Sequence, residues 1–520
     1  MMKKALSVCL IWILLAQIAV MIYYGNAKQG FHMDEILSFQ ISNLFEEKEG
    51  YHIGHRSDLY DRWHETEYFA DAVMMQEENA FDFSGVCQNL KFDNHPVFFN
   101  VALSAACSLF PGVFSKWLGI VPNILYFLLT QIVLYAIGRR LGKSAVFGLL
   151  LVAAYGFSAA AISNVVFIRM YAMVMLWSVM QIYCHLQIYE DFTRKKWYVL
   201  AGFLTFLGLN THYYFLIFQF FVSACCFSWM LARRSWKNAA AYAASIFAWM
   251  GVFLLLWPVA VVHITGGERG TEAFANLMSS HNYLNEFLAN LNGLLANGRS
   301  RRGVKIFALL TLAAFVRKGK DIIHADTNRM TLLTMGVTVC GYVLMVSKIA
   351  PFGEIRYMLP VLPLLVTSVL WGFWHVMLKL LGNSKVVSLC LAIMIAAITF
   401  NCHCGKCVWY LFMEWPYEMD TVQAYRELDA VVLADTSWKT AGSMVLHLSE
   451  HPRTYVTNSA GVTGLAEATE DCRDGFFLYV EKDNRLEENL ERIKEAVKCS
   501  AEEVYGGNEH FNMYFCSWIE

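Results

Sequence analysis

The stretch Phe31-His32-Met33-Asp34-Glu35-Ile36-Leu37-Ser38 follows a long apolar segment, Ala5–Tyr24, which opens the chain after two lysines. That segment has about 20 residues, which suits a membrane-spanning helix and exceeds the apolar core of a signal peptide. The adjacent carboxylates of Asp34 and Glu35 therefore stand at a membrane boundary, where losing water is costly for them. Such a pair is either a hydrated acidic loop or a working site, and the rest of the sequence decides between the two.

The composition indicates an α-helical protein with many membrane-spanning helices. Of the 520 residues, 57% are hydrophobic and only 16% are charged, and the mean hydropathy is +0.40. Soluble domains carry about 25% charged residues. The net charge of −2 gives no basis for a nucleic-acid partner. The sequence contains neither a P-loop nor a dinucleotide-binding glycine motif, so it does not indicate a nucleotide cofactor.

The positions of the basic residues predict the topology. After the first span, further spans are predicted at 118–138, 144–163, 170–189, 197–212, 214–232, 239–260, 304–316, 331–347, 357–378 and 385–401. Val97–Phe110 is too short for a span and suits a re-entrant or interfacial helix. If it does not cross, the basic clusters near 139–143, 194–196, 233–237, 317–320 and 379–385 all share the side of Lys3 and Lys4. The positive-inside rule then predicts eleven spans in the plasma membrane, with the N-terminus cytoplasmic and the C-terminus outside.

Outside the spans, the pattern predicts two regions. Residues 1–401 form the membrane domain, including an outer loop over 25–116 in which Thr66–Glu78 is a short amphipathic surface helix. Residues 402–520 form a small extracytoplasmic α/β domain with strands at Val431–Ala434, Thr454–Thr457 and Phe476–Val480, helices at Trp438–Leu448 and Leu486–Val497, and a hairpin turn at Gly506-Gly507. A surface helix is also expected over 284–295. The basic residues Arg299, Arg301 and Arg302 after it would lie outside, against the trend of the other clusters.

The cysteines do not specify a metal site. Seven of the 14 lie in apolar spans, where they are ordinary small core residues. The run Cys402-His403-Cys404-Gly405-Lys406-Cys407 resembles a zinc ligand set but lacks a second spaced pair. On the outer face disulfides are the commoner outcome, so we assign no metal, and the pairing of the six C-terminal cysteines stays open.

The predicted topology gathers unusual polar residues at the outer face. They are Asp34, Glu35, His95, Lys116, Arg169, Tyr171, His212, Tyr213, Arg356 and Tyr357. A carboxylate suits a general base, and the planar fork of a guanidinium matches phosphate oxygens. Taken singly, each has a plainer explanation, because arginines at span ends reach for lipid headgroups and tyrosines populate the interfacial belt.

Five motifs in order carry a family resemblance. They are Met33-Asp34-Glu35, Asn94-His95-Pro96-Val97-Phe98-Phe99, Gly138-Arg139-Arg140-Leu141-Gly142, Arg169-Met170-Tyr171 and Arg356-Tyr357-Met358-Leu359-Pro360-Val361-Leu362-Pro363. Together they resemble the GT-C superfamily of membrane glycosyltransferases, most closely glycosyltransferase family 39. The resemblance covers residues 1–400. It departs from the family where Val97 follows Pro96 in place of a second proline, and where Lys116 stands in place of an arginine.

The resemblance implies an enzyme that transfers a sugar from a polyprenyl-phosphate carrier, with inversion, to an outer glycan, lipid or protein acceptor. By that resemblance Asp34 is the general base, with Glu35 beside it in the catalytic site. Arg169 and Arg356 hold the donor phosphate, and His95, Lys116, Tyr171, His212, Tyr213 and Tyr357 contribute further substrate contacts. A divalent cation near His32 and the two carboxylates is left open.

A transporter or flippase of lipid-linked saccharides is the alternative function. Such a protein is expected to carry ionisable residues or broken helices near the middle of the membrane. Here the span centres are nearly free of charge and the polar residues gather at one face. This asymmetry favours catalysis at the membrane surface.

Overall fold

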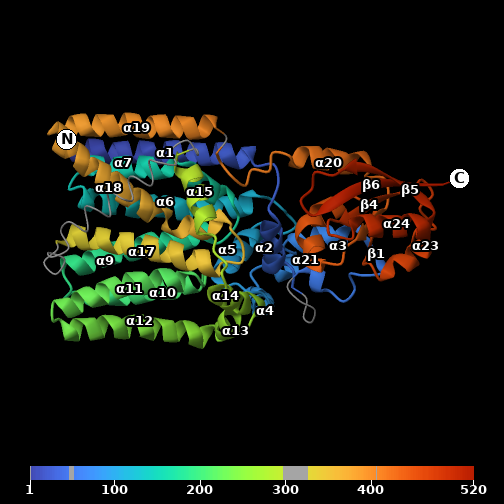
Figure 1. Cartoon of the computed structure of the whole chain (residues 1–520), viewed down its shortest axis with the longest axis horizontal. Coiled ribbons are helices and arrows are strands. Elements are labelled where there is room, and N and C mark those ends of the chain that lie inside the picture. Colours follow the sequence, from blue (N-terminus) through green and yellow to red (C-terminus); the bar gives the residue numbers. More distant parts are fainter. Residues whose placement is uncertain (1, 46–51, 297–325, 406, 520) are drawn as a thin grey trace. The chain divides into compact units, whose positions relative to one another are not determined.

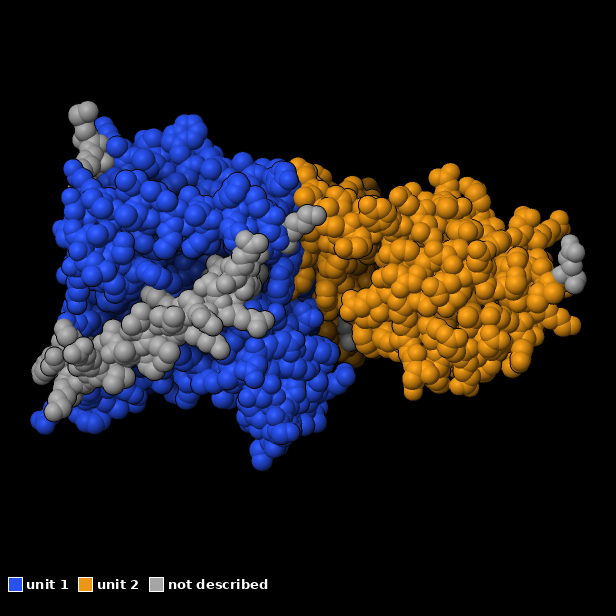
Figure 2. Space-filling model, turned by 45° about the horizontal axis from the view of Figure 1, so that its top comes forward, with its two compact units in different colours: residues 1–25, 94–99, 120–409 blue, residues 26–93, 100–119, 410–520 orange. Residues whose placement is uncertain are grey.

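A computed structural model describes residues 2–45, 52–296, 326–405 and 407–519. The chain divides into two compact units, coloured separately in Figure 2. Unit 1 comprises Met1–Gly25, Asn94–Phe99 and Ile120–Trp409, and unit 2 comprises Asn26–Asp93, Asn100–Gly119 and Tyr410–Glu520. Each unit is described by itself below.

Unit 1 is a bundle of long apolar helices that run side by side (Figure 1). Seven helices of the described chain are long and apolar enough to cross a membrane, namely α1 (Met2–Ala27), α6 (Trp117–Leu141), α11 (Phe215–Ala232), α12 (Trp236–Leu256), α17 (Thr327–Ile349), η5 with α18 (Ile355–Val361 and Leu362–Leu381) and α19 (Ser384–Cys404). An eighth arises if α7 (Ala145–Gly156) and α8 (Ala159–Val166), which meet at 58°, count as one broken span. The bundle thus confirms a polytopic helical protein.

The expected number of eleven spans is not reached among the described residues. The predicted spans 170–189 and 197–212 are helices α9 (Tyr171–Glu190) and α10 (Lys196–Leu209), but α10 is short. Helix α9 is buried along most of its length, and its polar residues bond to neighbouring helices, as His185 Nε2 does to Tyr242 Oη at 2.8 Å. A helix surrounded by protein has less need of apolar residues than one facing lipid. The predicted span 304–316 and Arg299, Arg301 and Arg302 lie outside the described residues.

Several helices of the described chain are too short to cross a membrane. Helix α5 (Phe98–Ser108) has 11 residues, in keeping with the prediction that Val97–Phe110 does not span. The connection after α12 contains α13 (Val259–Thr265), α14 (Glu268–Met278) and α15 (Leu284–Ala296). Helix α15 coincides with the predicted surface helix at 284–295, and its Phe287 and Leu291 are buried.

Unit 2 is built on a six-stranded sheet with the order β1-β3-β2-β4-β6-β5. The strands are β1 (Arg62–Glu65), β2 (Ala430–Leu433), β3 (Arg453–Thr457), β4 (Phe476–Glu481), β5 (Cys499–Tyr505) and β6 (Phe511–Trp518). Strands β3, β2 and β4 are mutually parallel, whereas β1, β6 and β5 pair antiparallel. The three strands predicted after residue 430 and the hairpin at Gly506-Gly507 are therefore present.

Helices cover both faces of this sheet. Helices α23 (Leu465–Ala468) and α24 (Leu486–Val497), with η7 (Gly461–Gly464), pack on the face that carries Leu478 and Val480. Tyr479 points to the opposite face because side chains alternate along a strand. There its ring lies 6.5 Å from His447 of α22. That second covering segment runs from α21 (Ser437–Lys439) through the π-helical turn η6 (Thr440–Met444) to α22 (Val445–Leu448).

Residues of the first outer loop belong to the same unit as the C-terminal sheet. Strand β1 pairs with β3, with Trp63 opposite Tyr455. The loop also holds α2 (Met33–Asn43), η1 (Ile53–His55), α3 (Thr66–Ala70), η2 (Asp71–Val73), η3 (Glu77–Asn79) and α4 (Phe83–Phe92), and α20 (Trp415–Ala424) follows the membrane helices. Unit 2 therefore contains residues 26–93 and 100–119, which the expected domain 402–520 does not include. The amphipathic surface helix predicted over Thr66–Glu78 is replaced by the short elements α3, η2 and η3. Phe69 of α3, Val73 of η2 and Met75 after it are buried within the unit.

Candidate active site

The acidic turn begins helix α2 through a reciprocal cap. The Asp34 backbone N–H donates to His32 Nδ1 at 3.1 Å, and the His32 backbone N–H donates to Glu35 Oε2 at 2.6 Å. This is the geometry of a capping box, with histidine as the capping side chain. The local sequence therefore fixes where α2 starts and how its first turn is oriented.

Glu35 is the buried partner of Lys28. The Lys28 Nζ lies 2.9 Å from Glu35 Oε2, and neither side chain is exposed. The ammonium also donates to the Tyr410 carbonyl at 2.9 Å and lies 4.9 Å from the centre of the Phe412 ring. Burial lowers the pKa of Lys28, and the neighbouring Glu35 carboxylate opposes that shift. A buried charge is tolerated only with such a partner, so the geometry favours a positioning role for Glu35.

Asp34 is the carboxylate of the pair that reaches solvent. Its side chain is 25% exposed, and Oδ2 lies 3.7 Å from His32 Nδ1. The hydroxyl of Ser38 donates to the Asp34 carbonyl at 2.7 Å, one turn along α2. A general base must exchange a proton with a substrate, which requires access that Glu35 lacks.

Lys116 supports the connection that precedes this turn. Its ammonium donates to the carbonyls of Asn26, at 3.3 Å, and of Lys28. Burial lowers the pKa of Lys116. These bonds hold the segment between α1 and α2 in place. The predicted contact of Lys116 with a phosphate stays a prediction.

In unit 1, the structure brings together the residues predicted to hold phosphate. Arg169 lies between α8 and α9, and its Nη2 donates to His95 Nε2 at 3.0 Å. Arg356 lies in η5, with its guanidinium carbon 5.4 Å from the centre of the Tyr357 ring. Both arginine side chains are almost fully buried, at 4% and 6% exposure.

His212 lies close enough to Arg169 and Arg356 for their charges to affect its pKa. Its ring lies 5.6 Å from that of Tyr171, in the turn between α10 and α11. Burial, followed by the charges of His95, Arg169 and Arg356, lowers the pKa of His212 to about 3. The imidazole of His212 is therefore neutral near pH 7. Two buried guanidiniums at the end of a membrane bundle suit an anionic ligand such as a phosphate.

Tyr213 is hydrogen-bonded to residues of the segment that follows α12. Its hydroxyl bonds to His263 Nδ1 at 2.9 Å and accepts from Trp257 Nε1 at 3.1 Å. His263 is buried on α13. Sequence analysis missed His263, Trp257 and also Lys28, because each lies in an apolar or loop segment without a local pattern that marks it.

The motif Gly138-Arg139-Arg140-Leu141-Gly142 has a packing role. A Cβ built on Gly138 would lie 3.0 Å from Gly148 Cα, so α6 and α7 cross where neither has a side chain. Arg140 forms an ion pair with Glu190 at the end of α9. These contacts explain the motif through the packing of the bundle.

The described residues do not offer a good divalent cation site. They contain no group of three His, Cys, Asp or Glu side chains placed to hold an ion. At the acidic turn, Glu35 is already neutralised by Lys28 at 2.9 Å. We therefore derive no catalytic step through a metal.

The long apolar helices and the polar residues gathered near their ends define a multi-pass membrane protein. No protein-family model matches the chain, and no curated protein matches it. Solved structures do resemble it. The apo structure of ArnT from Cupriavidus metallidurans aligns over 97% of both chains with a TM-score of 0.52 and 11% sequence identity.

Two further solved structures align less closely. ArnT from the same organism bound to undecaprenyl phosphate covers 97% of this chain and 98% of that one, with a TM-score of 0.47 and 13% identity. The oligosaccharyltransferase of Archaeoglobus fulgidus in complex with Zn and sulfate covers 91% and 72%, with a TM-score of 0.44 and 11% identity. The likeness to apo ArnT shows that this chain shares the fold of that protein.

Proposed function

We propose that this protein is an integral membrane glycosyltransferase that uses a polyprenyl-phosphate sugar as donor. The observation that carries the proposal is the pair of buried arginines, Arg169 and Arg356, whose charges act on the neutral His212. Buried cations at one end of a bundle of apolar helices suit a phosphate whose hydrocarbon chain stays in the membrane. The fold shared with apo ArnT and the motifs that resemble the GT-C superfamily support the same function.

In the proposed reaction Asp34 takes the proton from a hydroxyl of the acceptor. The acceptor oxygen then forms a bond to the anomeric carbon as the bond between that carbon and the phosphate oxygen breaks, which inverts the configuration. Negative charge develops on the departing phosphate, where Arg169 and Arg356 stabilise it. Lys28, through Glu35 at 2.9 Å, holds the turn that presents Asp34.

The remaining predicted contacts keep supporting roles. His95 orients Arg169 through their 3.0 Å hydrogen bond. Tyr171 and Tyr357 lie against His212 and Arg356, where they line the phosphate site. We further propose that the protein lies in the plasma membrane with its N-terminus cytoplasmic and unit 2 extracytoplasmic. The sugar and the acceptor, whether glycan, lipid or protein, are for experiment to identify.

Asp34→Asn tests the proposal directly. The change is nearly isosteric but removes the basic oxygen, so single-turnover transfer should slow by about 10²–10⁴-fold. Binding of the donor should persist, because the arginines are unchanged. The matched control is Asp420→Asn, which alters an exposed carboxylate of unit 2 on α20. Unchanged transfer by a folded Asp34→Asn protein would remove Asp34 as the base. Absence of any transfer by the folded wild-type protein would favour the transporter alternative.

A further inference from the structure

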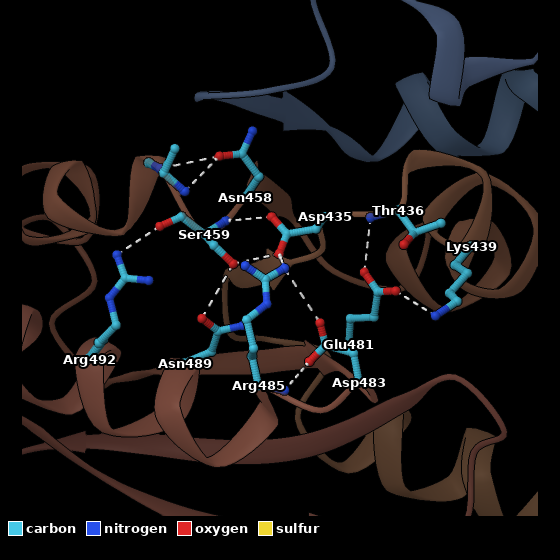
Figure 3. Close-up of polar contacts among 12 residues, drawn as sticks. Asp435, Thr436, Lys439, Asn458, Ser459, Glu481, Asp483, Arg485, Asn489 and Arg492 are labelled. Carbon is cyan, nitrogen blue, oxygen red and sulfur yellow. Dashed lines mark hydrogen bonds and ion pairs between the residues drawn. The ribbon is translucent and has the colours of Figure 1, made fainter.

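Polar side chains converge where the three parallel strands of unit 2 end (Figure 3). Asp435 follows β2, Ser459 follows β3, and Arg485 follows β4. The strands themselves are buried and largely apolar. This concentration at one edge of the sheet is separate from the turn that carries Asp34.

At this end of the sheet, the connections that follow β2 and β3 pass to opposite faces. The chain leaving β2 passes through Ser437–Leu448 to one face, and the chain leaving β3 passes through η7 and α23 to the other face. Strands β2 and β3 are neighbours, so their following loops diverge from adjacent positions. In open α/β sheets ligands bind in the crevice formed at such a point, outside the carboxyl ends of the strands.

The side chains at this end of the sheet are held in fixed positions by contacts with one another. Asp435 accepts the Ser459 backbone N–H at 2.9 Å and the Ser459 hydroxyl at 2.5 Å, and it forms an ion pair with Arg485. Arg492 donates to the Ser459 carbonyl at 2.8 Å. Asp435 and Arg485 still have side-chain exposures of 28% and 46%, so a ligand from solvent can reach them.

An exposed tryptophan adjoins the polar group. Glu481 accepts the Thr436 backbone N–H at 2.9 Å and the Lys439 ammonium at 2.5 Å. That ammonium lies 5.9 Å from the centre of the Trp438 ring, and 43% of Trp438 is exposed. Large exposed aromatic residues next to ordered polar groups are common where proteins bind ligands.

The balance of charge selects the kind of ligand. The basic side chains of the group, Lys439, Arg485 and Arg492, do not outnumber the acidic ones, Asp435, Glu481 and Asp483. Asp61, which accepts the Thr457 hydroxyl at 2.7 Å at the end of β3, adds a further carboxylate. An anionic ligand such as a phosphate gains no net attraction from such a group. Sugar hydroxyls both donate and accept hydrogen bonds, as carboxylates and guanidiniums together require, and the apolar face of a sugar ring packs against indole. We propose that this end of the sheet, with Trp438 beside it, is a binding site for a neutral saccharide.

The helical segment Ser437–Leu448, which contains Trp438, also contacts α2. A Cβ built on Gly442 would lie 3.2 Å from Met33 Cβ, and Gln40 Nε2 donates to the Ala441 carbonyl at 2.8 Å. The helical segment that starts beside Trp438 thus packs directly on the helix that begins with Met33 and Asp34. The proposed site holds the saccharide part of a glycan-bearing acceptor, an assignment of the acceptor that rests on the proposed function.

The test measures binding and turnover separately, with the full chain in nanodiscs. Saturation-transfer difference NMR with glucose, galactose, mannose, N-acetylglucosamine and their disaccharides should show binding without any donor. Trp438→Ala and Asp435→Asn should weaken that binding by about tenfold or more, the effect of losing a dominant contact. The control is Trp518→Ala, which changes a comparably exposed tryptophan on β6.

In transfer assays Trp438→Ala should raise KM for the glycan acceptor about tenfold and leave kcat within about twofold, whereas Asp34→Asn lowers kcat. Absence of binding by any sugar of the panel, or binding that both variants retain in full, would overturn the saccharide site. Binding that depends on Trp438 in a protein without transferase activity would uphold the site and refute the proposed function. An unchanged KM in an active Trp438→Ala enzyme would overturn the acceptor assignment alone.

Discussion

Lys28→Met is expected to destabilise unit 2 out of proportion to the size of the change. Methionine has nearly the length of lysine and suits an apolar site, but it cannot neutralise Glu35. The Glu35 carboxylate would then stay fully buried after losing the Lys28 ammonium, while the His32 backbone N–H still donates to it at 2.6 Å. Removing one partner of a buried ion pair is strongly unfavourable for this reason.

The expected loss is about 3–5 kcal/mol of the free energy of unfolding. Unit 2 has about 200 residues, and in a domain of that size 1 kcal/mol shifts Tm by about 2–4 °C. Lys28→Met should therefore lower the Tm of unit 2 by roughly 6–20 °C. Combining it with Glu35→Gln removes both charges and keeps an acceptor for His32, so the double variant should recover most of that loss.

Thermal unfolding in detergent, followed by tryptophan fluorescence, provides the measurement. Hydrogen exchange in peptides covering α2 shows whether the loss is local. The control is Arg426→Met, which breaks an exposed ion pair with Glu427 and should change Tm by no more than about 2 °C. Our account of the acidic turn would be wrong if Lys28→Met melted like the wild type, or if the double variant lost the sum of the single losses.

The other predictions concern the phosphate site, pH and topology. Arg169→Lys and Arg356→Lys should each weaken donor binding by about tenfold to a hundredfold, measured with a polyprenyl phosphate, because lysine lacks the guanidinium fork; unchanged affinity in both would contradict the phosphate role. Burial lowers the pKa of His451 to about 4. The unfolded chain therefore takes up this proton first, and the Tm of unit 2 should fall as pH drops from about 6.5 towards 4, less steeply in His451→Gln. A cysteine placed at Lys195 in a cysteine-free background should resist impermeant reagents in intact cells; its labelling would reverse the topology.

The local sequence was sufficient to predict most individual helices and strands. The apolar length of Ser384–Cys404, the helical periodicity of Leu486–Val497 and the glycine pair at 506–507 each specify their structure within a few neighbouring residues. The motifs around Asp34, Arg169 and Arg356 likewise predict a GT-C fold, and the chain shares the fold of apo ArnT. Arg169 and His95 are 74 positions apart, yet the order of the motifs was enough to place both in one predicted site.

The family resemblance assigned the base to Asp34, but only the tertiary structure shows how the environments of the two carboxylates differ. Glu35 is enclosed by Lys28 and the Tyr410 carbonyl, whereas Asp34 keeps access to solvent. The pairing of β1 with β3 joins residues almost 400 positions apart, which no local pattern encodes. Hydrophobic length and periodicity are properties of a segment by itself. The burial of a charge depends on which distant residues fold against it, and so it is decided only when the whole chain has packed.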